Sequence, residues 1–238
     1  MKRAATVFIA FLVLGLACAT APQAERSPWH EVPNVPDGRY LVFPPLEPPG
    51  EKTPLLFALH GWGGEALSYG RLWHEALQGG YLVVAPQATP KPRGGAAVST
   101  WSTSKADRDY LLQVWDEIHR DYRIDPERTV VVGYSAGGLA AAAIVENRNA
   151  EVAAVIFHAC RPYAKPALLK GKHVFLLAGE RDTSFNAKKA GAALAELTAQ
   201  GVDVRLAVAP GVSHVTVYDK VKDAARWVLG GFAAPTGE

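Results

Sequence analysis

Cysteine is scarce in this chain, with only Cys18 and Cys160 among its 238 residues. Two cysteines cannot build a multi-disulfide scaffold, and if Cys18 is modified then Cys160 has no partner within the chain. We expect Cys160 to be a small buried residue that closes the apolar strand 152–159. No histidine or cysteine cluster has metal-ligand spacing and no glycine-rich loop fits a phosphate site, so no metal and no cofactor are predicted.

An excess of charge of one sign is also lacking. The 25 basic and 23 acidic residues leave a formal charge of +2, and no long run of like charge appears. Nothing therefore indicates a nucleic acid or an anionic surface as a partner. Internal repeats and a second composition regime are absent as well. The length suits one domain with a sizeable core.

The N-terminus has the pattern of an export signal. Lys2 and Arg3 precede the apolar stretch 7–16, which ends in small residues. This stretch is shorter than the ~20 apolar residues that a membrane-spanning helix needs, so a permanent transmembrane anchor is disfavoured. A basic start, a short apolar segment and a small-residue exit are typical of a bacterial secretory signal peptide.

Two outcomes of processing remain open. Residues 14–18, Leu-Gly-Leu-Ala-Cys, resemble the lipobox at which bacterial lipoproteins are cut and acylated on the new N-terminal cysteine, here Cys18. Alternatively, cleavage after Ala19 releases a soluble periplasmic or secreted protein. We expect residues 1–18 to be a lipoprotein-type signal peptide. The proline-rich residues 19–36 are then a tether between the membrane and the domain.

The rest of the chain alternates between apolar runs of strand length and helical patterns. Strands are expected at 39–43, 55–59, 81–85, 129–132, 152–157, 173–178 and 204–208, and helices at 67–77, 107–122, 138–146, 187–199 and 217–229. Residues 86–103 are expected to be a loop, and Asp107 to cap the helix that follows. Repeated strand–helix alternation predicts an α/β domain over residues 37–232, with a mostly parallel twisted sheet and helices on both faces.

The run Gly-Tyr-Ser-Ala-Gly at 133–137 follows a β-branched strand and precedes an alanine-rich stretch. In that context G-x-S-x-G is the nucleophile elbow of an α/β-hydrolase fold, which holds Ser135 on a strained turn above the carboxyl edge of the sheet. Gly133 and Gly137 are expected because side chains there would collide across the turn. The alternative is a serine that only caps a helix.

A serine hydroxyl needs a base, and in this fold the chain order is serine, acid, histidine. His214 follows the last expected strand and therefore lies at the same sheet edge as Ser135. His158 also ends a strand, but it precedes every plausible acid. Of the other histidines, His30 falls in the tether and His60 in the loop after the first buried strand. His74 and His119 fall in helices, and His173 lies at the opposite edge of the sheet. Asp182 ends the preceding strand and is the expected acid, with Glu180 as its local rival and a turn-forming role as its alternative.

Two backbone N–H groups are expected to bind the oxyanion, those of Ala136 and of Trp62 in the glycine-rich loop 60–64. His60 is better suited to supporting this loop than to reacting. The Trp62 indole either walls the substrate pocket or packs in the interior. Three more aromatic residues lie in loops near this edge and either line a pocket for an apolar or aromatic group or simply pack the loops: Trp101, Tyr163 and Phe185.

These features resemble the secreted α/β-hydrolases related to polyhydroxybutyrate depolymerases, feruloyl esterases and the dienelactone hydrolase group. The resemblance covers about residues 39–229 and rests on the segments 59–61, 124–128, 179–182 and 211–214. It implies the α/β-hydrolase fold and a Ser-His-Asp triad. Ser135 stands where dienelactone hydrolases carry cysteine, which counts against that particular activity.

We predict a serine hydrolase that cleaves a small-molecule carboxylic ester through an acyl-enzyme, using Ser135, His214 and Asp182. The catalytic core fills the expected mature chain without a binding module or long lid, which favours small accessible esters over polymers. A peptidase or amidase with the same triad is one alternative. A catalytically silent envelope lipoprotein is the other, and the intact triad and oxyanion loop argue against it.

Overall fold

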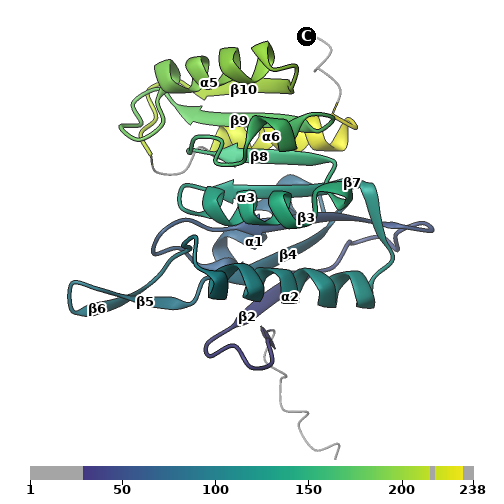
Figure 1. The fold of residues 1–238 in the computed structure, drawn as a ribbon. Helices are drawn as coiled ribbons and strands as arrows, with labels where there is room; N and C mark the ends of the chain where they lie inside the picture. The colour runs from purple at the N-terminus through teal and green to yellow at the C-terminus, as the bar shows by residue number, and fades with distance from the viewer. Residues whose placement is uncertain (1–28, 215–217, 233–238) are drawn as a thin grey trace, which may run out of the picture.

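The computed structural model describes residues 29–214 and 218–232 (Figure 1). The strands are β1 Trp29–Glu31, β2 Arg39–Phe43, β3 Thr53–Leu59, β4 Leu82–Gln87, β5 Pro90–Arg93, β6 Ala96–Ser99, β7 Ile124–Tyr134, β8 Ala154–His158, β9 His173–Gly179 and β10 Asp203–Ala209. The helices are α1 Ala66–Ala76, α2 Lys105–Asp121, α3 Gly137–Asn147, α4 Pro166–Leu169, α5 Ala187–Ala199 and α6 Tyr218–Leu229, with a 3₁₀ turn at Asn149–Glu151. The expected signal peptide and Cys18 lie outside the described residues.

Eight strands form one sheet in the order β1-β2-β4-β3-β7-β8-β9-β10. The pairs from β4 to β10 are all parallel, whereas β2 pairs antiparallel with β4 and β1 antiparallel with β2. The predicted mostly parallel sheet is therefore confirmed. After β3 the chain continues to β4 on one side and later returns to β7 on the other. Ligands of open α/β sheets bind beside such a reversal, at the carboxyl ends of the strands.

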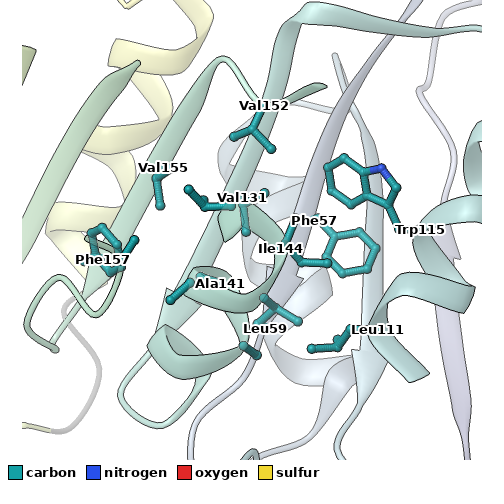
Figure 2. Packing of buried hydrophobic residues seen from close by; sticks show 14 of the residues in the cluster. Phe57, Leu59, Leu111, Trp115, Val131, Ala141, Ile144, Val152, Val155 and Phe157 are labelled. Carbon is teal, nitrogen blue, oxygen red and sulfur yellow. The ribbon is translucent and has the colours of Figure 1, made fainter. Parts of the chain in front are cut away.

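The middle strand β3 is buried along its whole length. Because side chains alternate along a strand, Phe57 and Leu59 point to the face covered by α2 and α3, while Leu56 and Ala58 point to the face covered by α1 and α6. Figure 2 shows Phe57 beside Trp115 of α2, at a ring distance of 5.3 Å, with α3 over the same face. Two apolar layers thus hold the sheet rigidly between helices.

The sheet begins earlier than expected. Trp29–Glu31, which the sequence analysis assigned to the tether, pairs with β2 in register from Trp29 opposite Leu41 to Glu31 opposite Arg39. The Arg39 guanidinium lies 4.3 Å from the Trp29 ring, and Val32 is buried. The tether prediction was therefore too long at its C-terminal end, because three residues of mixed polarity carry no periodic signal.

The segment expected to be a loop after β4 contains the hairpin β5–β6, which projects from the domain in Figure 1. Gly94 and Gly95 both have positive φ at its turn, which suits a tight hairpin. The following helix α2 begins earlier than predicted. Ser104 is its N-cap and accepts the Asp107 N–H, while Asp107 lies inside the helix and pairs with Lys91 at 2.9 Å.

Candidate active site

Ser135 lies on the turn between β7 and α3 and has a φ of +52°. This left-handed conformation is strained for a residue with a side chain, and the Ser135 N–H holds it by donating to the His158 carbonyl at 2.9 Å. A Cβ on Gly133 would lie 2.3 Å from the Gly137 carbonyl oxygen, and one on Gly137 would lie 2.1 Å from the Leu59 carbonyl oxygen. Glycine is therefore required at both positions, as the motif predicts.

The three residues predicted to act together form one hydrogen-bonded chain. Ser135 Oγ lies 2.9 Å from His214 Nε2, and His214 Nδ1 lies 2.7 Å from Asp182 Oδ2. The three residues follow β7, β9 and β10, which are parallel and end at one edge of the sheet. The Asp182 side chain is fully buried and that of His214 is partly exposed.

Asp182 is held by the turn that follows β9. Its Oδ1 accepts the backbone N–H groups of Ser184 at 2.7 Å and Phe185 at 3.0 Å, which leaves Oδ2 for His214. The rival Glu180 points elsewhere, because its Oε2 accepts the Gly211 N–H at 2.5 Å. Glu180 thus fastens the loop that carries the histidine, and Asp182 alone of the two contacts the imidazole.

The loop at 60–64, after β3, is held in place by hydrogen bonds of the His60 ring. His60 is almost fully buried, and its Nε2 accepts the Ala88 N–H at 3.0 Å. The ring hydrogen therefore sits on Nδ1 and is donated to the Gly61 carbonyl at 2.7 Å. Burial lowers the pKa of His60, which keeps the ring neutral. The predicted supporting role of His60 is confirmed by these contacts.

Trp101 supports the same loop. Its indole N–H donates to the His60 carbonyl at 2.9 Å, its ring stacks on Tyr110, and only 3% of the residue is exposed. These contacts match the alternative prediction, in which Trp101 packs the loop, and correct the one in which it lines a pocket. The position of an aromatic residue in a loop does not reveal which way its ring points.

The loop after β3 and the start of α3, which carry the predicted oxyanion donors, both lie next to Ser135. A Cβ on Gly61 would come within 3.3 Å of the Ser135 Cβ, so the loop after β3 reaches the nucleophile. Ala136 is the N-cap of α3, where backbone N–H groups lack helical partners. Among the residues that the structure describes, neither the Ala136 nor the Trp62 N–H donates to a protein acceptor. The role of both groups as oxyanion donors stays a prediction.

A cavity of about 840 Å³ opens beside Ser135 and His214. Tyr163 and Phe185 line it, as predicted, together with small and aliphatic residues of α3 and α5. Arg161 is exposed at the cavity and its guanidinium lies 4.8 Å from the Tyr163 ring. The wall of this cavity is therefore mixed: aromatic and aliphatic side chains stand beside three charged residues, Arg161, Lys189 and Glu196.

Cys160 also lines this cavity but is 4% exposed, and burial raises the pKa of its thiol. A protonated, buried thiol is a poor nucleophile, so the expected packing role of Cys160 is confirmed by its surroundings.

The Trp62 side chain points away from this cavity. It is 62% exposed and lines a second cavity of about 920 Å³, whose other residues include Glu31, Arg39 and Val98. The prediction that the Trp62 indole walls the substrate pocket or packs in the interior is therefore corrected. The predicted oxyanion role concerns the Trp62 backbone N–H and stays a prediction.

Three residues that the sequence analysis did not assign to the site form a layer behind it. The Tyr134 hydroxyl donates to the His214 carbonyl at 2.5 Å, and its ring lies 4.8 Å from that of His158. His158 is fully buried with its Nδ1 3.2 Å from the Tyr69 hydroxyl. Burial, aided by the nearby His214, lowers the pKa of His158 to about 3. The one sequence signal for Tyr134 is its place before the nucleophile.

No group of three or more His, Cys, Asp or Glu side chains within residues 29–214 and 218–232 is arranged to hold a metal ion. Over the same residues, no helix combines the length and apolar character needed to cross a membrane.

Comparison with known proteins identifies a family and a sequence relative. The dienelactone hydrolase family matches residues 45–226. A bifunctional acetylxylan esterase/xylanase of Neocallimastix patriciarum is 33% identical over 91 residues, which are 37% of this chain but only 13% of that longer protein.

Solved structures share the fold. A carboxylesterase from Mesorhizobium loti has a TM-score of 0.65 at 17% identity and covers 86% of this chain and 100% of its own. Acyl-protein thioesterase 2 of Zea mays has a TM-score of 0.64 at 16% identity, covering 82% and 100%. A Bacillus cereus carboxylesterase has a TM-score of 0.59 at 18% identity, covering 81% and 94%. At such identities the likeness shows the predicted α/β-hydrolase fold and nothing narrower.

Proposed function

Since the chain belongs to the dienelactone hydrolase family, we propose that it hydrolyses carboxylic esters through Ser135, His214 and Asp182. The observation that carries this proposal is the unbroken hydrogen-bonded chain from Ser135 Oγ through His214 to the buried Asp182 carboxylate. Nucleophile, base and orienting acid each have the partner that acyl transfer requires.

In the first half-reaction, Ser135 Oγ attacks the ester carbonyl carbon while His214 Nε2 takes the hydroxyl proton. Asp182 accepts the Nδ1–H, which keeps the imidazole in the right tautomer and stabilises its protonated form. The oxyanion of the tetrahedral intermediate accepts the N–H groups of Ala136 and Trp62. Each such donor contributes roughly 3–4 kcal/mol of transition-state stabilisation.

The intermediate collapses when the carbonyl reforms and the bond to the alcohol oxygen breaks. His214 gives its proton to the departing alcohol, which leaves the acyl group on Ser135. In the second half-reaction a water molecule loses a proton to His214 and attacks the acyl carbon. Release of the carboxylic acid returns the proton to Ser135, so the enzyme is regenerated without a cofactor.

The substrate class is proposed from the cavity. Its apolar wall, formed by Tyr163, Phe185 and aliphatic residues of α3 and α5, suits the acyl part of a small-molecule ester. The names of the relatives, an acetylxylan esterase and carboxylesterases, support ester over amide bonds. The same triad serves a peptidase or amidase, and that activity is the alternative.

We also propose that the chain is exported and anchored by lipid on Cys18. The support is the lipobox-like sequence of residues 14–18 behind a basic start and a short apolar segment. In a bacterial host, radiolabelled palmitate is expected to enter the wild-type protein and not a Cys18→Ala variant. Equal labelling of both proteins would contradict the anchor, and absence of label from both would favour the soluble exported form.

Labelling by a fluorophosphonate probe tests the proposed chemistry. The probe phosphonylates only activated serines, so the purified protein is expected to be labelled at Ser135. Ser135→Ala serves as the negative control. A panel of 4-nitrophenyl esters of rising acyl length, set against aminoacyl anilides, is expected to show hydrolysis of short and medium esters and little of anilides. A folded protein that neither reacts with the probe nor hydrolyses any ester would support a silent hydrolase fold instead.

A further inference from the structure

The residue before the nucleophile contacts the base loop, residues 210–214, which carries the general base. Tyr134 and His214 are 80 positions apart, yet the Tyr134 hydroxyl donates to the His214 carbonyl at 2.5 Å. The two rings are also stacked, with centroids 5.6 Å apart and planes inclined by 27°. Tyr134 therefore contacts both the main chain and the imidazole of His214.

The same ring lies against the oxyanion loop, residues 60–64. A Cβ on Gly61 would be 2.7 Å from Tyr134 Cδ1, so any side chain at position 61 would collide with the edge of the Tyr134 ring. Gly61 immediately precedes Trp62, whose N–H is one proposed oxyanion donor. One aromatic ring thus fills the space between the base loop and the oxyanion loop, directly beside Ser135.

Buried aromatic groups support the ring from behind. Its centroid is 4.8 Å from that of His158 and 6.1 Å from that of Tyr69, and both of those residues are buried. Because packed interiors are rigid, this layer limits how far the Tyr134 ring can tilt. A hydroxyl on a rigid ring is a good anchor for a loop.

The base loop needs such an anchor near its end. Its early part is held by Gly211, whose N–H donates to Glu180, and by Val212, whose carbonyl accepts the Arg181 N–H at 2.8 Å. Both contacts precede the histidine. The Tyr134 hydroxyl adds a hydrogen bond at His214 itself, the residue whose Nε2 must stay 2.9 Å from Ser135 Oγ.

We propose that Tyr134 is a positioning residue for His214, an inference that rests on the proposed serine-hydrolase function. It holds the imidazole in line with Ser135 during the proton transfers of both half-reactions, and its hydroxyl donates to the His214 carbonyl and not to a reacting atom. Loss of its hydroxyl leaves the ring and the apolar cavity in place. The fraction of time for which His214 is aligned falls, so kcat falls while KM stays nearly constant.

Tyr134→Phe tests this proposal, with Tyr110→Phe as the matched control. Tyr110 is buried and also donates its hydroxyl to backbone carbonyls, those of Arg39 and Gln87, but it does not contact His214. Each variant loses one hydroxyl group that donates to the backbone. We expect similar losses of thermal stability, but a roughly ten- to hundredfold lower kcat on a 4-nitrophenyl ester only for Tyr134→Phe, with KM within about twofold of wild type.

Proton NMR supplies a readout that stability alone does not change. The His214 Nδ1–H shared with Asp182 is expected to give a low-field signal in the wild type and in Tyr110→Phe. In Tyr134→Phe that signal is expected to broaden or weaken because the imidazole samples other orientations. Esterase activity of the wild type, abolished in Ser135→Ala, is established first, so that failure of the proposed function is recognised separately.

Given an active wild type, equal kcat values for Tyr134→Phe and Tyr110→Phe would overturn the proposal. A fall in kcat that only follows the loss of folded protein, with an unchanged NMR signal, would overturn it too. A selective fall in kcat with a weakened low-field signal supports it.

Discussion

Two loops meet at Ser135, and each contains a histidine in a different state. His60, in the loop after β3, is buried, and its two ring nitrogens are hydrogen-bonded to the Gly61 carbonyl and the Ala88 N–H. His214, in the loop after β10, is partly exposed, and its ring nitrogens face the side chains of Ser135 and Asp182. The same residue type is therefore a fixed support in one loop and the proposed proton carrier in the other.

The difference lies in what the ring nitrogens can exchange. A ring that is hydrogen-bonded only to amide and carbonyl groups has no acidic or basic hydrogen-bond partner, and burial disfavours its charged form. A ring placed between a hydroxyl and a buried carboxylate can take a proton from one and be stabilised by the other. The hydrogen-bond partners, more than proximity to Ser135, are the reason for proposing that His214 and not His60 reacts.

Replacing each histidine in turn tests whether the two residues have these different roles. His214→Ala is expected to lower kcat/KM on a 4-nitrophenyl ester by roughly 10⁴- to 10⁶-fold with little loss of stability, because it removes the general base. His60→Ala is expected to lower the unfolding free energy by about 2–4 kcal/mol, because it leaves buried backbone groups unpaired and opens a cavity.

Kinetics and urea unfolding on both variants measure the two effects. The activity of His60→Ala, per folded molecule, should stay well above that of His214→Ala. Comparable losses of activity per folded molecule for both variants would contradict the division of roles.

Asp182→Asn gives the next largest expected effect. The asparagine keeps the size of the side chain and one oxygen, but its amide group donates toward His214 Nδ1 and favours the wrong tautomer. We expect kcat to fall by roughly 10³- to 10⁴-fold. Glu180→Gln, which changes the neighbouring carboxylate in the same way, is expected to change kcat by less than about tenfold. The reverse ranking would make Glu180 the orienting acid.

The buried His158 is expected to make the free energy of unfolding depend on pH. Its pKa is lowered from 6.5 to about 3 in the folded protein, so below pH 6.5 the unfolded chain binds a proton that the folded chain does not. Above pH 6.5 the ring is neutral in both states and His158 does not lower the free energy of unfolding. As the pH falls from 6.5 toward 3, the free energy of unfolding decreases by up to about 1.4 kcal/mol per pH unit.

Urea unfolding between pH 7 and pH 4 measures this slope. His158→Gln is expected to flatten it, whereas His74→Gln, a change at the surface, is expected to leave it as in the wild type. An identical slope in His158→Gln and wild type would show that other groups govern the pH dependence.

Trp62→Ala has the smallest expected effect. The large indole is mostly exposed in the second cavity, and the proposed role belongs to the backbone N–H, which alanine retains. We expect kcat/KM for a small ester to change by less than about threefold. Trp62→Pro, which removes the N–H, is expected to lower it by roughly 10²- to 10³-fold. If Trp62→Ala were as damaging as Trp62→Pro, the indole itself would have to contact the substrate.

Periodicity and chain order were enough to predict the sheet and the triad from the amino-acid sequence. The strand–helix alternation, the elbow at Ser135 and the positions of Asp182 and His214 were readable because parallel strands bring their carboxyl ends to one edge. The directions of loop side chains were not readable, since no period relates Trp62 or Trp101 to a face.

Two other features escaped prediction for physical reasons. Strand β1 is three residues long and stabilised by its neighbour β2, so no pattern within it marks a strand. Tyr134 occupies the variable position of its motif, and its role depends on a loop 80 residues away. Tertiary contacts of this kind appear only once the chain is folded.

Trapping of an acyl-enzyme is the most direct test of the proposal that the protein hydrolyses esters through Ser135. The wild-type protein is mixed with 4-nitrophenyl acetate, quenched after a few milliseconds to seconds, and analysed by intact mass and peptide mapping. We expect an acetyl group on Ser135 that forms together with a burst of nitrophenol and then decays at the steady-state rate. Ester hydrolysis that leaves no acyl group on Ser135, or that persists undiminished in Ser135→Ala, would contradict it.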